Sequence, residues 1–314
     1  MTDQAFSRRS FIAGVAAAGA LGWMHDSPAF SARILRGACG DARREVTQIA
    51  PANLDHWSDN TIDLCWVGHA SVLVNFFGVH ILTDPVLFER VGAQIGIGTL
   101  GRKRLVAPAI DPNNLPRIDM VLLSHAHMDH MDLPSLSRMP QTARVVTAPN
   151  TSDILTGQPF ARPTELRWNE KSIIATPSGD IEIQAVEVKH WGARWKFDDH
   201  RGYVGYLLKR GGKTILFGGD TAYTGAFAEL RHHKIELAIM PIGSYGSRSG
   251  NHCTPEETVR MVDQAGAHFI VPIHHSTFPI GKEPLEEPLA RLEAAVPGDR
   301  IALKQIGATW RLPA

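Results

Sequence analysis

Four potential metal ligands lie close together in the stretch His125-Ala126-His127-Met128-Asp129-His130. His125 and His127 are two positions apart, so in an extended segment their imidazoles point to the same side and can bind one ion. Asp129 and His130 come after a turn and can serve a neighbouring ion. Imidazole and carboxylate ligands suit zinc, with manganese and iron as alternatives, and the stretch has no cysteine for a structural thiolate site. The spacing therefore predicts two adjacent metal sites.

A buried strand is predicted over residues 118–123, directly before this metal loop (residues 124–130). The run is short, uninterrupted and rich in branched apolar residues, which is typical of a strand covered on both faces. Open α/β sheets place their chemistry at the carboxyl ends of their strands. Similar positions at the ends of predicted strands belong to Asp84, His190, Asp220 and His274. We therefore expect these residues to join the metal loop at one edge of the fold.

The globular domain is predicted to span residues 61–314, after a polar lead-in segment at residues 33–60. Glycines, prolines and basic residues without any period fill residues 89–117, which predicts a long loop that carries substrate contacts. The remaining patterns predict strands and helices in alternation. The predicted strands are 62–67, 71–77, 79–83, 118–123, 143–147, 171–175, 181–188, 202–209, 214–217, 237–240 and 268–273, and the predicted helices are 133–139, one that starts at Thr151, 224–232 and 255–265.

The composition is that of an ordinary soluble domain, with 44% hydrophobic and 20% charged residues. Basic and acidic residues number 32 each, so no overall charge draws the chain to nucleic acid. Three cysteines are too few and too scattered for a disulfide framework, whereas 15 histidines are unusual. The nature of any partner must therefore be inferred from the site, and the oligomeric state stays open, a homo-oligomer included.

Residues 1–32 resemble a twin-arginine signal peptide. The motif Ser7-Arg8-Arg9-Ser10-Phe11-Ile12 precedes a weakly apolar, alanine-rich stretch that is shorter than the ~20 residues of a transmembrane helix. Ala29 and Ser31 supply cleavage positions. The sequence thus predicts export of a folded, metal-loaded protein to the periplasm or beyond, with no transmembrane helix in the mature chain.

Taken together, the motifs of this chain resemble those of the metallo-β-lactamase superfamily. More narrowly, they are similar to the N-acylphosphatidylethanolamine phospholipase D group and its bacterial relatives, including enzymes like ascorbate-6-phosphate lactonase. The likeness runs from about residue 62 to the C-terminal sheet. The segments that carry it are Trp66-Val67-Gly68-His69-Ala70-Ser71, Leu82-Thr83-Asp84-Pro85, the metal loop with Met131-Asp132, His190-Trp191, Gly219-Asp220-Thr221, Pro241-Ile242-Gly243-Ser244-Tyr245, His252 with Pro255-Glu256-Glu257, and Ile273-His274.

This resemblance implies an α/β fold, a four-layer αββα sandwich with the site at the edge of the two sheets. The ligands that it implies are His125, His127 and His190 for one ion, Asp129, His130 and His274 for a second ion, and a bridging Asp220. Asp84, Ser124 and Thr221 are expected to support these ligands and to fix the imidazole tautomers. His275 is not an expected ligand, because His274 directly ends its strand. His69 is interpreted as structural.

The activity implied is metal-dependent hydrolysis by a hydroxide that two divalent cations share, the cations being zinc, manganese or iron. Asp129 is expected to orient the hydroxide, and Asp220 to keep the cations adjacent. Arg248 and His252, in the loop opposite, would bind an anion and help the leaving group depart.

A small-molecule or phospholipid-like phosphodiester, cleaved as by a phospholipase D, is the expected substrate. A lactonase, or another hydrolase of cyclic esters or amides, is the close alternative on the same site. A non-hydrolytic iron-binding redox protein is a weaker alternative, because no flavodoxin-like or rubredoxin-like extension is present.

Overall fold

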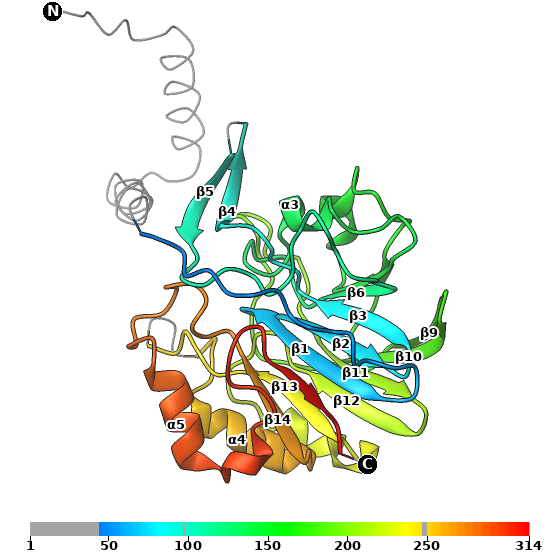
Figure 1. Ribbon diagram of the computed structural model, residues 1–314, viewed down its shortest axis with the longest axis vertical. Coiled ribbons are helices and arrows are strands. Elements are labelled where there is room, and N and C mark those ends of the chain that lie inside the picture. The colour runs from blue at the N-terminus through cyan, green and yellow to red at the C-terminus, as the bar shows by residue number, and fades with distance from the viewer. Residues whose placement is uncertain (1–43, 97, 247–249, 314) are drawn as a thin grey trace, which may run out of the picture.

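The computed structural model describes residues 44–96, 98–246 and 250–313. Two β-sheets face each other in the middle of the molecule, and helical segments lie on their outer sides (Figure 1). The predicted four-layer αββα sandwich is therefore confirmed. The twin-arginine segment, the start of the lead-in segment and Arg248 lie outside the described residues.

The first sheet has seven strands in the order β15-β1-β2-β3-β6-β7-β8. Strands β1, β2 and β3 form an antiparallel meander, and β6 then pairs with β3 in parallel. The parallel pairing brings the carboxyl ends of β3 and β6 to the same edge, so Asp84 and the metal loop are neighbours. The strands are β1 Ile62–Gly68, β2 Ser71–Phe76, β3 Val79–Thr83, β6 Met120–Leu123, β7 Arg144–Thr147, β8 Thr164–Glu165 and β15 Thr309–Arg311.

The second sheet has six strands in the order β14-β13-β12-β11-β10-β9. Strands β12, β13 and β14 are parallel, which brings the segments after β12 and β14 to one edge of this sheet. Asp220 and His274 come from those two segments. The strands are β9 Lys171–Thr176, β10 Gly179–Val186, β11 Gly205–Arg210, β12 Lys213–Phe217, β13 Leu237–Pro241 and β14 Phe269–Ile273.

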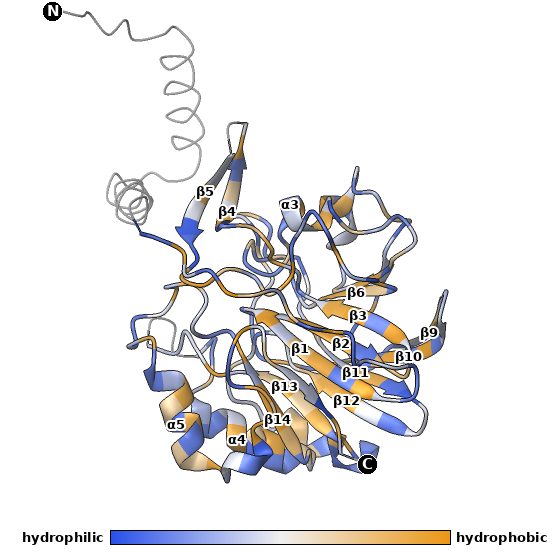
Figure 2. Cartoon of the chain, viewed as in Figure 1, coloured by the Kyte–Doolittle hydropathy of each residue, from blue (hydrophilic) through white to orange (hydrophobic). Residues whose placement is uncertain are grey.

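The main hydrophobic core lies between the two sheets, and a further cluster lies on the outer face of each (Figure 2). Trp66 and Phe76 of the first sheet and Phe217 of the second are fully buried in the central core. Burial of such side chains contributes roughly 1.5–3 kcal/mol each. The Tyr206 hydroxyl donates a hydrogen bond of 2.9 Å to the Leu123 carbonyl, which joins β11 to the end of β6. The metal loop therefore starts from a rigid platform.

Helix α4 begins where its sequence predicts. Thr254 is the N-cap, its hydroxyl accepts a hydrogen bond from the Glu257 N–H, and the Glu257 side chain completes a capping box. Gly266, with φ +72°, ends the helix in the left-handed conformation. The α-helices are α3 Leu133–Leu136, α4 Pro255–Ala265 and α5 Glu287–Ala295, and the 3-10 helices are η1 Ser152–Leu155, η2 Gly225–His233 and η3 Gly298–Arg300.

Other helix predictions were less accurate. The helix predicted over residues 133–139 ends at Leu136, close to Pro140, which disfavours helical backbone before it. The segment after Thr151 forms a single 3-10 turn, and the helix predicted over residues 224–232 is also of the 3-10 type. Helix α5 and the short strands β8 and β15 were not predicted.

The long loop predicted over residues 89–117 was wrong in part. Strands β4, Arg90–Ile95, and β5, Gly98–Lys103, form a hairpin that projects from the body of the molecule (Figure 1). Gly92 and Gly101 face each other in it, and a Cβ on Gly101 would lie 1.9 Å from the Val91 carbonyl oxygen. The glycines therefore allow a close backbone approach within a strand pair rather than marking a loop.

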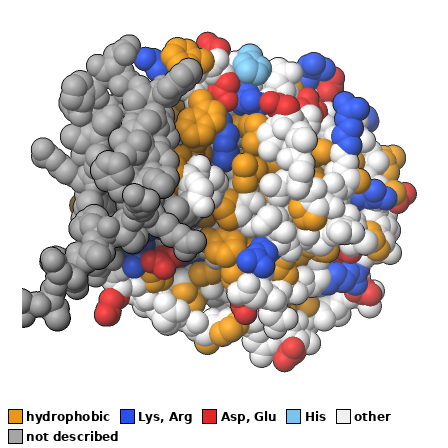
Figure 3. Space-filling view, turned by 90° about the horizontal axis from the view of Figure 1, so that it is seen from above, with side chains coloured by type: hydrophobic (Ala, Val, Ile, Leu, Met, Phe, Trp, Pro, Cys, Tyr) orange, Lys and Arg blue, Asp and Glu red, His pale blue; other side chains and the backbone are white. Residues whose placement is uncertain are grey.

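The face on the hairpin side carries hydrophobic side chains interspersed with lysines and arginines (Figure 3). Over the described ranges, no helix combines the length and the apolar character needed to cross a bilayer.

Candidate metal centre

Three imidazoles meet at the end of β6: His125 and His127, which the spacing of the metal loop predicts to be neighbours, and His190, which the family resemblance adds to them. His125 Nε2 lies 2.8 Å from His127 Nδ1, and His190 Nε2 lies 3.4 Å from the same atom. His190 comes from the segment after β10, which ends at Val186, two residues earlier than predicted. These three histidines form one group of potential ligands whose donor atoms lie within 4.8 Å of one another.

A second group gathers around Asp129. Its Oδ2 atom lies 3.2 Å from His69 Nε2, 3.7 Å from His274 Nε2 and 3.9 Å from His130 Nε2. Asp129 is the more accessible member of this group, with 21% of its side chain exposed, whereas the three imidazoles are buried. The group therefore has one side open to solvent.

Asp220 lies between the two groups. Its Oδ2 atom is 3.2 Å from the Nε2 atoms of both His130 and His274, and 3.7 Å from His190 Nε2. A single carboxylate oxygen is thus within reach of both groups. Asp220 therefore lies between the two groups of ligands that the resemblance implies.

Asp84 holds the metal loop from behind. Its carboxylate accepts hydrogen bonds from the Ser124 N–H at 2.8 Å, from the Ser124 hydroxyl at 2.5 Å and from His130 Nδ1 at 2.7 Å. Ser124 Oγ also lies 2.9 Å from His125 Nδ1. These contacts turn the Nε2 atoms of both histidines toward the cluster. Thr221 does not act in this way, because its hydroxyl bonds the Lys189 N–H and the Ala222 carbonyl.

The outer nitrogens of the remaining histidines are also engaged. His190 Nδ1 donates to the Asn251 carbonyl at 2.8 Å, and His274 Nδ1 lies 3.4 Å from Ser244 Oγ. His275 instead turns away and stacks on Trp66, with ring centroids 4.6 Å apart. The geometry therefore favours His274 over His275 as the histidine of the cluster.

The backbone around the cluster is strained. In the described part of the chain, nine residues other than glycine have positive φ, and five of them are at this site: His69, Asp84, Ser244, His274 and Ser276. Such conformations cost of order 1–3 kcal/mol each and persist where the surrounding structure enforces them. Their concentration here indicates that the placement of the side chains, rather than the preferred φ and ψ values of these residues, decides the local backbone conformation.

Burial and charge divide the cluster into two electrostatic classes. Burial lowers the pKa of His125 and of His190 well below the usual imidazole value. Both imidazoles are therefore neutral and can offer a nitrogen lone pair to a cation. Burial acts in the same direction on His130 and His274, but the Asp220 carboxylate outweighs it and raises the pKa of His130 well above its usual value and that of His274 to about 9. Although burial opposes it, His130 in turn keeps the pKa of Asp220 well below its usual range. The buried carboxylate thus requires positive charge beside it.

The donor atoms fit divalent cations. Among the described residues, His130 Nε2, His274 Nε2 and Asp220 Oδ1 are buried without a hydrogen-bond partner of acceptable geometry. An unsatisfied buried polar atom costs about 1–3 kcal/mol, so three at one spot indicate a group that binds them. Imidazole nitrogens with carboxylate oxygens are a ligand set for zinc, manganese or iron.

His252 lies inside this cluster. Its ring is buried, its Nδ1 atom is 3.7 Å from Asp220 Oδ2, and with His190 and Asp220 it forms a further group of potential ligands. His252 therefore reaches the site from the opposite loop, as the sequence predicts. The proposed partner of His252 in that loop, Arg248, is outside the described residues.

His69 also lies in the cluster. The sequence interpretation gives it a structural role and not that of a ligand, and its Nε2 atom lies 3.2 Å from Asp129 Oδ2, while its ring centroid is 4.2 Å from that of His274. His69 directly follows β1, so the rule that singled out Asp84 and His274 applies to it as well. Because it joins Asp129, His130 and His274 in one group of potential ligands, the geometry fits a ligand role as well as a structural one.

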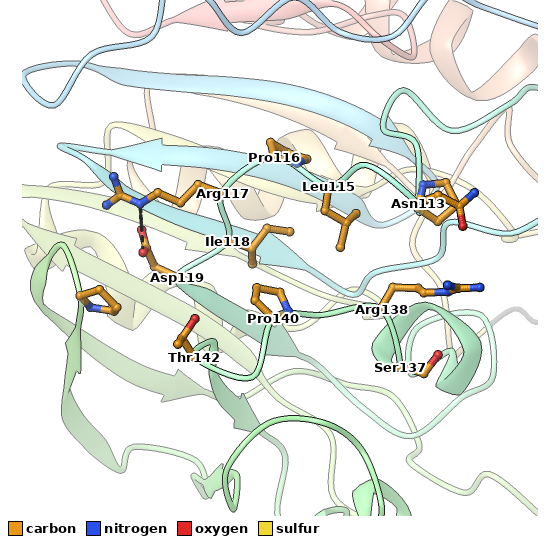
Figure 4. A pocket seen from close by; sticks show the side chains of 12 residues that line it. Asn113, Leu115, Pro116, Arg117, Ile118, Asp119, Ser137, Arg138, Pro140 and Thr142 are labelled. Carbon is orange, nitrogen blue, oxygen red and sulfur yellow. Dashed lines mark hydrogen bonds and ion pairs between the residues drawn. The ribbon is translucent and has the colours of Figure 1, made fainter.

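A cavity of about 780 Å³ lies away from this cluster. Its walls include Leu115, Ile118, Arg138 and Pro140 (Figure 4). Residues 118 and 119 enter β6, whereas the metal loop leaves it, so the cavity lies at the opposite end of that strand. A cavity of this size is therefore found where the potential metal ligands are not.

Comparison with known proteins gives relatives in sequence. A family model described as a beta-lactamase superfamily domain matches residues 80–275. An uncharacterised protein of Mycobacterium tuberculosis is 28% identical over 265 residues, covering 81% of this chain and 69% of the relative. The N-acyl-phosphatidylethanolamine-hydrolyzing phospholipase D 1 of Caenorhabditis elegans is 29% identical over 243 residues, covering 72% of this chain and 67% of the relative.

Solved structures share the fold. A metallo hydrolase from Ignicoccus hospitalis superposes with a TM-score of 0.59 at 19% identity, covering 81% of this chain and 99% of that chain. CmlA, a diiron β-hydroxylase from Streptomyces venezuelae, superposes with a TM-score of 0.58 at 20% identity, covering 81% of this chain and 54% of that chain. At these identities the likeness concerns architecture, and the fold alone accommodates more than one chemistry.

Proposed function

This chain belongs to the beta-lactamase superfamily, and on that premise we propose that it is a metal-dependent hydrolase that cleaves phosphodiesters in the manner of a phospholipase D. The observation that carries the proposal is the position of Asp220 Oδ2, within 3.2–3.7 Å of imidazoles from both ligand groups. A carboxylate so placed suits two cations side by side. The phosphodiester preference is supported by the likeness to the nematode phospholipase D.

The proposed cations are two zinc ions. One ion would be held by His125, His127 and His190. The other ion would be held by Asp129, His130 and His274, and Asp220 would contact both ions. When bound, divalent cations supply an activated water and stabilise the negative charge that develops on the phosphoryl oxygens.

Two residues of the chain are suited to proton handling. The partly exposed Asp129 carboxylate, fixed by His69 at 3.2 Å, can accept a hydrogen bond from the attacking water and aim a lone pair of that water at phosphorus. The buried His252 imidazole, beside Asp220, can hold a proton for the departing alkoxide. Burial of the surrounding groups excludes competing water and strengthens these interactions.

The test is an assay of purified, metal-loaded protein on bis-p-nitrophenyl phosphate, on N-acylphosphatidylethanolamine and on simple lactones. We expect turnover of the phosphodiesters, lost in His125→Ala and kept in His80→Gln. His80 is a matched control, because it lies at the amino end of β3, away from the cluster, and its ring contacts the Arg117 carbonyl there. Turnover of lactones alone would replace the phosphodiesterase proposal with a cyclic-ester hydrolase, and di-iron content without any hydrolysis would favour the redox alternative.

We also propose that the protein is exported by the twin-arginine route, from the motif Ser7-Arg8-Arg9-Ser10-Phe11-Ile12. The test is a fusion of residues 1–32 to a reporter protein that folds in the cytoplasm. We expect the reporter in the bacterial periplasm, and its retention in the cytoplasm when Arg8 and Arg9 are both replaced by lysine. Retention of the unaltered fusion would exclude export by this segment.

A further inference from the structure

Two aromatic side chains beside the metal centre are exposed to solvent. Phe197 is 82% exposed and Trp195 is 44% exposed, which makes Phe197 the most exposed large hydrophobic residue in the described part of the chain. Lys196 lies between them and is itself exposed, with its ammonium 5.5 Å from the centre of the Phe197 ring. We call residues 195–197 the aromatic tip. Its two rings remain in water although folding buries most side chains of their kind.

The aromatic tip is held in place from both sides. On one side, the Arg194 guanidinium donates hydrogen bonds of 2.9 Å to the carbonyls of Ala126 and Met131. On the other side, the buried Asp198 carboxylate accepts hydrogen bonds of 2.6 Å from the Trp195 N–H and from Arg201. The exposure of the rings is therefore a consequence of a fixed loop conformation and not of a loop without contacts.

The same loop reaches the proposed metal ligands. Ala126 and Met131, which Arg194 binds, lie within and just after the metal loop. Trp191, four residues before the tip, has its ring 4.4 Å from that of His127 and 4.3 Å from that of His190. The segment that carries the tip thus also packs against the metal loop and against two of its proposed ligands.

We propose that the aromatic tip docks the protein on the surface of a phospholipid bilayer. Tryptophan and phenylalanine rings partition into the boundary between headgroups and acyl chains, and a lysine among them pairs with lipid phosphates. Charge complementarity supports this partner, because among the described residues no carboxylate lies within ion-pair distance of the Lys196 ammonium. Asp199 is exposed next to the tip, so its charge limits any preference for strongly anionic membranes.

Insertion of the aromatic tip alone into a membrane is consistent with the absence of net charge on the chain. Its basic and acidic residues cancel, so no overall field draws it to a membrane, and contact must come from a defined patch. This inference rests on the proposed phosphodiesterase function for its consequence, the delivery of a lipid phosphodiester to the metal centre. The docking itself is measured without turnover.

The experiment measures vesicle binding by flotation of the full, metal-loaded chain with vesicles of phosphatidylcholine and phosphatidylglycerol in a four to one ratio. Quenching of tryptophan fluorescence by brominated lipid reports insertion. We expect the double variant Trp195→Ser and Phe197→Ser to bind at least about 10-fold more weakly than the unaltered chain. Ile173→Ser is the matched control, since Ile173 is another exposed large hydrophobic residue, on β9, and its loss is expected to leave binding unchanged.

Three outcomes would overturn the proposal. The first is an unaltered chain that does not float with vesicles, and the second is a double variant that floats equally well. The third is self-association that Phe197→Ser abolishes in the absence of vesicle binding, which would assign the tip to contact between copies of the chain. None of these outcomes bears on bis-p-nitrophenyl phosphate turnover by the unaltered chain, so failure of the docking and failure of the proposed function remain distinguishable.

Discussion

The two ends of strand β6 differ in every property that defines a site. At its carboxyl end, imidazoles and carboxylates converge in groups whose potential ligand atoms lie within 4.8 Å of one another, and most of these residues are buried. At its amino end, an open cavity of about 780 Å³ is bounded by prolines, arginines and aliphatic side chains (Figure 4). Only four residues, Met120–Leu123, separate the two regions, which is roughly 13 Å of extended chain.

The difference shows that the convergence of polar side chains, and not the volume of a cavity, identifies the chemically active region of this fold. In the cavity, the Arg117 guanidinium is paired with Asp119 at 3.1 Å, and Asp119 also accepts a hydrogen bond from the His80 N–H. These charges are therefore already compensated. No residue lining the cavity has the positive φ found at the metal centre, within the part of the chain that is described. The residues that line the cavity at the amino end have ordinary backbone conformations. The carboxyl end combines strained backbone with buried polar atoms that have no hydrogen-bond partner among the described residues.

The sharpest test of this contrast is removal of the carboxylate between the two ligand groups. Asp220→Ala should lower kcat/KM for bis-p-nitrophenyl phosphate about 10³-fold, because it removes several kcal/mol of transition-state stabilisation that the cations supply. Metal analysis should show fewer than two ions per chain. Asp59→Ala, an exposed carboxylate near the amino end, is the control and should keep both metal and activity. Full metal content with full turnover in Asp220→Ala would show that the carboxylate does not bridge.

A smaller loss is expected when the support behind the metal loop is weakened. Asp84→Asn keeps the shape of the side chain but replaces one acceptor with a donor, facing the Ser124 hydroxyl and His130 Nδ1. Metal affinity, measured by competition with a chelator, should fall about 10- to 100-fold.

The matched control for Asp84→Asn is Asp63→Asn. Asp63 is also a fully buried carboxylate of the first sheet, but it pairs with Arg311 on the outer strand β15. Its replacement should lower the free energy of unfolding while metal affinity stays the same. Equal metal loss in both variants would mean that Asp84 acts through general stability and not through the metal loop.

The sequence predicted the site better than it predicted the elements around it. His125, Asp220 and His274 each follow a buried strand, and the parallel pairing of β3 with β6 and of β12, β13 and β14 places those strand ends at one edge of each sheet. His190 follows β10, which runs in the same direction as β12 because β11 lies antiparallel between them. Such a rule needs only local hydrophobic patterns and chain order. The order of strands in each sheet was not predicted, because it depends on pairing between segments far apart in the chain.

The predictions from sequence were wrong where one local sequence pattern is compatible with more than one structure. Gly92 and Gly101 looked like loop residues, but they are opposite one another in the β4–β5 ladder, where no side chain fits. Strand β15 is three residues long, too short for any period to be detected, and its pairing with β1 depends on the whole fold. The role of His69 stays open for a similar reason, because a residue of a tight turn and a ligand position give the same short pattern.

His69 offers a finer test of the strained carboxyl end. His69→Asn keeps a residue type that tolerates the left-handed backbone at φ +55°, but its side chain is too short to reach Asp129. If His69 positions Asp129, kcat should fall about 10-fold with metal content unchanged. If His69 is itself a ligand, metal content should fall together with activity, as in His274→Ala. Equal activity in His69→Asn and the unaltered chain would contradict both roles.

The smallest effect is expected at the amino end of β6, and it decides whether the two ends are independent. Arg138 is exposed on the wall of the cavity, and its guanidinium lies 5.8 Å from the centre of the Phe88 ring. Exposed contacts of this kind contribute about 0.5–1 kcal/mol, so Arg138→Gln should change the free energy of unfolding, measured by urea titration, by no more than that. Its kcat/KM should stay within about twofold of the unaltered value, because Arg138 is on the surface and the four residues of β6 separate its cavity from the metal loop. A loss of tenfold or more with unchanged stability would contradict this independence and would mean that substrate, or a group that controls its entry, occupies the cavity.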